Sequence, residues 1–114
     1  MLGPAWSAFC TLSLAILSLT PGQFMVRTGS LSGHEEHFLA YFLSAATIAL
    51  VRRASNSALT GLVLVLYAGA LEWGQRYVPG RHPDLGDFCA SALGALVGVA
   101  VALPLFRAVV REPL

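Results

Sequence analysis

The fold class is decided by residues 54–76, which read ASNSALTGLVLVLYAGALEWGQR. From Ala54 to Leu71 the stretch contains no charged residue, and it then ends in the polar sequence EWGQR. A helix needs about 20 predominantly apolar residues to cross the hydrocarbon core of a bilayer. Apolar side chains occur on nearly every face of this helix, as expected for a helix surrounded by lipid. The stretch therefore predicts a membrane-spanning helix that delivers ionisable side chains to one membrane face.

Three other charge-free stretches occur, at residues 1–26, 37–51 and 88–106. Pro-Gly pairs, a Gly/Ser-rich segment and a double arginine separate them, and such short connections place consecutive helices antiparallel. The second stretch is long enough to span only if its helix begins near His34. We predict a single all-α domain over 1–114, a four-transmembrane-helix up-down bundle. Its helices are expected at about 5–21, 34–52, 56–77 and 86–108.

The composition supports a membrane protein. Hydrophobic residues make up 56% of the chain and charged residues only 11%, whereas soluble domains carry about 25% charged residues. The net charge of +1 gives no reason to expect nucleic acid as a partner. Cys10 and Cys89 lie in or beside apolar segments at opposite depths of the predicted bundle. We therefore expect no disulfide between them.

The arginines predict the orientation, because cytoplasmic loops carry an excess of Lys and Arg. One face of the four-span topology holds both termini and four arginines, and the other face holds three. The first set is Arg52, Arg53, Arg107 and Arg111; the second is Arg27, Arg76 and Arg81. The count favours both termini in the cytoplasm.

Most chemically capable side chains fall on the opposite, outer face. His34, His37 and Tyr41 share one stripe of the second helix, because they follow i, i+3, i+7 spacing. Ionisable residues at the ends of apolar spans are costly unless they are paired, which makes them functional candidates. Glu72 follows the apolar run directly, with Arg76, Arg81 and His37 as its expected partners. The sequence predicts that Glu72, His37, Arg81 and Asp87 converge on one pocket.

Two roles follow for this cluster, beside a purely structural alternative. We expect Glu72 or His37 to act as a general base if the protein is an enzyme. We expect the ligand to be bound by Arg81, Asp87, Gln75, Arg76 and Tyr41. The alternative is that these residues are interface anchors, that Asp87 caps the fourth helix, and that Gly94 and Gly98 are a packing device.

A metal site is weighed separately. His34 and His37 with Glu35, Glu72 or Asp87 could form a His/carboxylate set, but His-x-x-His spacing is generic and no cysteine joins it. The sequence therefore predicts neither a metal site nor a cofactor.

Several short motifs resemble those of VanZ-like membrane proteins. The segment HFLAYF at 37–42 resembles the family's HF-x-x-Y signature. EWGQ at 72–75, PGR at 79–81, Asp87 and the glycines at 94 and 98 resemble its E-x-x-Q, P-G-R, D and G-x-x-x-G block. The resemblance covers about residues 15–100, and the motifs agree in order and in placement relative to four spans. Two positions depart from it: Gly33-His34 stand where the family has Asp-Lys, and Ser91 stands where it has Asn.

The resemblance implies a bacterial, four-spanning protein of the cell envelope. The founding member of that family is associated with resistance to the glycopeptide antibiotic teicoplanin. For this chain the resemblance implies recognition or modification of a membrane lipid or a lipid-linked envelope precursor at the outer face. Whether it is a binding protein or an enzyme stays open. A small oligomeric transporter and a structural accessory protein are the alternatives, and a transporter would be expected to carry its key acid nearer mid-membrane.

Overall fold

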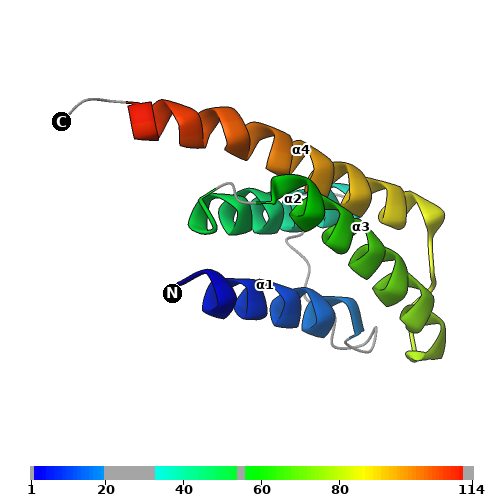
Figure 1. The fold of residues 1–114 in the computed structure, drawn as a ribbon. Coiled ribbons are helices and arrows are strands. Elements are labelled where there is room, and N and C mark those ends of the chain that lie inside the picture. The colour runs from blue at the N-terminus through cyan, green and yellow to red at the C-terminus, as the bar shows by residue number, and fades with distance from the viewer. Residues whose placement is uncertain (1, 20–32, 54–55, 112–114) are drawn as a thin grey trace.

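A computed structural model describes residues 2–19, 33–53 and 56–111, and all regular structure in these segments is helical. The elements, in chain order, are α1 (Leu2–Leu19), α2 (Gly33–Val51), α3 (Ser57–Gly74), the short 3-10 helix η2 (Gln75–Tyr77) and α4 (Leu85–Arg111). Consecutive helices run in alternating directions, and the four lie side by side as an elongated bundle (Figure 1). The all-α class is confirmed for the described residues, and the helix bounds lie close to those predicted.

Two of the helices are long and apolar enough to cross a membrane. They are Ser57–Tyr77, which comprises α3 and η2, and Leu85–Val109 within α4. The apolar segment Gly3–Leu19 of α1 is shorter, and α2 begins with a polar turn that carries Glu35 and Glu36. Leucine, valine and phenylalanine side chains are exposed along α1, α3 and α4, as expected where lipid is the solvent.

The closest helix contact joins α2 to α4. A methyl group built on Gly94 would collide with the carbonyl oxygen of Phe38, and one built on Gly98 would lie 2.6 Å from the carbonyl oxygen of Phe42. Alanines fill the rest of the seam, and Ala45 has no exposed surface. Small residues allow two helix backbones to approach this closely in a membrane. The expected packing role of the two glycines is confirmed.

Helix α1 contributes Cys10 and Leu14 to the common apolar core and also makes polar contacts with the other helices. The indole N–H of Trp6 donates to Thr47 Oγ1 at 2.8 Å, and the Tyr67 hydroxyl donates to the carbonyl of Thr11. At its C-terminal end, two side chains from beyond α3 donate to carbonyls of Leu17 and Ser18. Those carbonyls belong to the last turn, where a helix leaves acceptors without partners of its own.

Candidate functional site

A pocket of about 470 Å³ lies at the end of the bundle where α2 and α4 begin and α3 ends. One wall is apolar and comes from α1 and α2, with Leu14, Leu17 and Ala40. The polar wall comes from the last turn of α1, from α2 and η2, and from the segment before α4 with the first turn of α4. Its side chains are Ser18, Glu36, His37, Tyr41, Gln75, Arg81, His82 and Asp87. The pocket thus combines apolar surface with charges of both signs.

Five of the seven residues predicted for the site line this pocket. His37 and Tyr41 lie one turn apart on α2, Gln75 is the first residue of η2, Arg81 lies in the segment before α4, and Asp87 is in the first turn of α4. Tyr41 and Gln75 are both almost fully buried, at 2% exposure. A segment far along the chain, residues 75–87, is therefore brought against the start of α2.

Glu72 and Arg76 do not belong to the lining. Glu72 is half-buried, and its Oε1 accepts a hydrogen bond from the backbone N–H of Asp84 at 2.7 Å. Among the described residues no ion pair joins Glu72 to Arg76, Arg81 or His37, so the expected pairing with these groups is wrong. The chain turns back just before α4, and this turn places the backbone N–H of Asp84 next to the Glu72 carboxylate. Arg76 is exposed.

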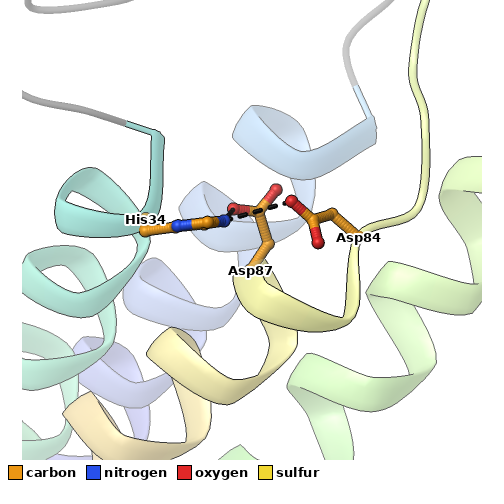
Figure 2. A group of neighbouring side chains, drawn as sticks. All are labelled: His34, Asp84 and Asp87. Atoms are coloured by element: carbon orange, nitrogen blue, oxygen red, sulfur yellow. Dashed lines mark hydrogen bonds and ion pairs between the residues drawn. The ribbon is translucent and has the colours of Figure 1, made fainter.

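Beside the pocket, one histidine faces two carboxylates (Figure 2). His34 Nε2 lies 3.1 Å from Asp84 Oδ2 and 3.3 Å from Asp87 Oδ1. The imidazole reaches from the first turn of α2 toward both acids, one just before α4 and one inside its first turn. The hydrogen bond from His34, and after it the N–H of Gly86, hold the pKa of Asp84 below its usual value.

Asp84, and not Asp87, caps α4. Its Oδ1 accepts the N–H of Gly86 at 2.8 Å, and its carbonyl accepts the N–H of Asp87 at 3.0 Å. This is the position and the hydrogen bond of an N-cap residue. The expectation that Asp87 caps the helix is wrong, because the helix begins earlier than a cap at 87 would require. Asp87 is consequently available to the two histidines.

His37 is held between a serine and an aspartate. Its Nδ1 lies 3.1 Å from Ser91 Oγ, and its Nε2 lies 3.9 Å from Asp87 Oδ2. Serine, histidine and aspartate are the members of a hydrolytic triad, but Ser91 is 2% exposed and does not line the pocket. Ser91 therefore orients the imidazole and is not placed as a nucleophile. The Nε2 edge of the His37 ring, which points toward Asp87, is the edge near the pocket.

Sequence reasoning missed two kinds of contact. One is to backbone: Gln75 Nε2 donates to the Ser18 carbonyl at 2.8 Å and Arg81 donates to the Leu17 carbonyl, and no side-chain pattern reports a carbonyl. The other is the His34–Asp84–Asp87 cluster, for which a signal existed, because Asp84 and Asp87 repeat the i, i+3 spacing of the two histidines. Comparison with protein-family models, with curated proteins and with solved structures finds no match for this chain.

Proposed function

We propose that this chain is a VanZ-like protein with four membrane spans, residing in a bacterial inner membrane with both termini in the cytoplasm. Its proposed activity is to bind the polar part of an envelope lipid or of a lipid-linked glycan precursor. The observation that carries the proposal is the mixed pocket at one end of an apolar bundle. An amphiphile presents the same combination of an apolar chain and a polar head.

The lining matches such a ligand group by group. Leu14 and Leu17 offer apolar surface on α1, where an acyl or prenyl chain would lie. Arg81 offers a guanidinium, which suits phosphate because its donors form a planar fork. Glu36 and Asp87 offer acceptors for hydroxyl or amine hydrogens. A phosphorylated head that also carries hydroxyls or an amine would use both signs of charge.

The family resemblance supports the same site. His37 and Tyr41 come from the HF-x-x-Y segment, Gln75 from E-x-x-Q, Arg81 from P-G-R, and Asp87 from the isolated aspartate position. These motifs are separated along the chain, yet all five side chains line one pocket. A shared pocket is a simple physical reason for these short motifs to occur together in one chain.

Native mass spectrometry of the protein in mild detergent tests the proposal. We expect a lipid to co-purify with the wild type and to be lost from Arg81→Ala. The matched control is Arg76→Ala, which removes the same charge from the same end of the bundle but outside the pocket. Because Arg81 also contacts α1, Asp87→Asn serves as a second pocket variant. A wild type without bound lipid, or equal loss from Arg76→Ala, contradicts the proposal.

A membrane enzyme is the second candidate, and the environment of His37 favours it. The imidazole lines the pocket, Ser91 fixes its orientation, and Asp87 lies beside Nε2. These are features of a histidine positioned as a general base. Glu72, the other predicted base, does not line this pocket, and its Oε1 accepts the Asp84 N–H, so His37 is the better placed of the two. Incubation of the co-purified lipid with wild type and His37→Gln distinguishes the two: only an enzyme changes the lipid's mass.

A further inference from the structure

The His34–Asp84–Asp87 cluster has donor atoms placed for a metal ion. One nitrogen of His34 and one carboxylate oxygen each of Asp84 and Asp87 lie within 4.8 Å of one another. They come from three separate places, the first turn of α2, the residue that caps α4, and the first turn of α4 (Figure 2). We propose that these three residues form a binding site for a divalent transition-metal ion of the zinc class. The inference does not depend on the lipid proposed above.

Two of the three donor separations are close to those around a zinc ion, and the third, between the two carboxylate oxygens, is no more than 4.8 Å. Bonds of about 2.0–2.2 Å to nitrogen and oxygen in tetrahedral geometry place neighbouring donors about 3.3–3.5 Å apart. His34 Nε2 lies 3.1 Å from Asp84 Oδ2 and 3.3 Å from Asp87 Oδ1. An ion could therefore enter between the imidazole and the two carboxylates with shifts of a few tenths of an ångström in those two separations.

The charges in the cluster also call for a cation. Two carboxylate oxygens face the same ring nitrogen, and that nitrogen carries at most one proton. A single N–H cannot serve both acceptors with good geometry, whereas a dication bonds to both oxygens and to the nitrogen. Asp84 can supply a ligand without losing its structural role, because Oδ1 caps α4 while Oδ2 faces His34.

Two neighbouring features hold this arrangement in place. A methyl group at Gly86 would lie 2.8 Å from His34 Nε2, so the absence of a side chain there lets the imidazole reach the carboxylates. The second oxygen of Asp87 lies 3.9 Å from His37 Nε2, and Ser91 fixes that ring through the other nitrogen. Partners of this kind orient the ligands of metal sites.

The site is accessible to water, and its ligand types favour some metal ions over others. The side chains of His34 and Asp84 are about half exposed, 56% and 53%, so an ion can enter directly from the aqueous phase. One imidazole with two carboxylates suits zinc, iron or nickel, whereas magnesium and calcium prefer oxygen ligands alone. With three protein ligands, a tetrahedral ion keeps one position for water or for a ligand group, as catalytic zinc sites do.

Zinc titration of the chelator-treated full chain in detergent, against a competing chromophoric chelator, tests the inference. We expect one saturable zinc ion per chain, with millimolar magnesium failing to displace it. His34→Ala and Asp84→Asn should each weaken binding at least tenfold. Asn caps helices as well as Asp does, so Asp84→Asn removes a ligand while keeping α4 intact. Cys89→Ser, which removes an exposed thiol near the same end of the bundle, should leave the affinity unchanged.

The outcomes separate this inference from the proposed function. A wild type without saturable zinc binding overturns it and leaves the cluster as an ion pair only. Undiminished binding by a folded Asp84→Asn protein also overturns it, because the metal would then lie elsewhere. Arg81→Ala, the variant expected to lose lipid, should bind zinc normally. Failure of the lipid proposal therefore leaves the zinc result intact, and the reverse also holds.

Discussion

Replacing Gly98 with alanine would place a methyl group between α2 and α4 at their closest approach. The new carbon would lie 2.6 Å from the carbonyl oxygen of Phe42 and 2.9 Å from Cβ of Ala45. A carbon next to a carbonyl oxygen normally lies about 3.3 Å away, so the helices would have to separate locally by about 0.7 Å. Both obstacles are backbone or the first atom of a short side chain, which no rotamer change can move.

The Gly98→Ala substitution has one unfavourable and one favourable effect on the free energy of unfolding. Extra carbon in a packed interior destabilises by about 1–3 kcal/mol, whereas alanine is about 1 kcal/mol better than glycine in a helix interior. Because the clash at Gly98 cannot be relieved by side-chain rotation, we expect a net loss of about 1–2 kcal/mol in the free energy of unfolding. Gly61 is the matched control: a methyl group there meets side-chain atoms alone, the nearest being Val99 Cγ2 at 3.2 Å and Leu96 Cδ2 at 3.6 Å. Gly61→Ala should be neutral or slightly stabilising.

Reversible unfolding in mixed detergent micelles, followed by circular dichroism, measures both variants. The seam also sets the distance between the start of α2 and the start of α4, so Gly98→Ala should weaken zinc binding as well. If Gly98→Ala is as stable as Gly61→Ala, the backbones at this seam separate without cost, and the close contact does not hold the two helices together.

Other predictions address the rest of the molecule. Maleimide should label exposed Cys89 rapidly and buried Cys10 slowly in the folded protein, and reduction should leave the intact mass of the monomer unchanged; a two-proton difference would mean a disulfide. Tyr67→Phe should cost about 1 kcal/mol through the lost hydrogen bond to the Thr11 carbonyl; an unchanged unfolding curve would show that α1 is held by other contacts. Reporter fusions should be active in the cytoplasm at the C-terminus and in the periplasm within 28–33; a C-terminal fusion active only in the periplasm would reverse the topology.

The features that follow from local rules were predictable from the sequence. The α2 start near His34 and the close packing at Gly94 and Gly98 depend on residue type and spacing, and both predictions are confirmed. The placement of His37, Gln75 and Arg81 around one pocket followed from assigning each to the same end of the bundle. Residues 28–32 of the predicted loop lie outside the described residues, and Gly33 is the first residue of α2.

Pairing within the site was not predictable in the same way. Glu72 was expected to meet an arginine or His37, but its partner is the backbone N–H of Asp84, whose position depends on how the chain turns before α4. For the same reason, the residue that caps α4 is Asp84 and not Asp87, which the sequence had suggested. Several acidic and basic side chains lie at one end of the bundle. Sequence spacing does not predict which acid meets which base, because some of these residues lie in the connection before α4, whose shape does not follow from the sequence.

The attachment of α1 has a consequence for how the protein is made. The last-turn carbonyls of Ser18 and Leu17 receive their hydrogen bonds from side chains 57 and 64 residues further along the chain. At a synthesis rate of about 5–20 residues per second, those side chains leave the ribosome roughly 3–13 seconds after α1. Until then these two carbonyls lack the side-chain partners that they have in the folded bundle. The first helix to be synthesised therefore receives its full set of contacts only after the segment beyond α3 has been made.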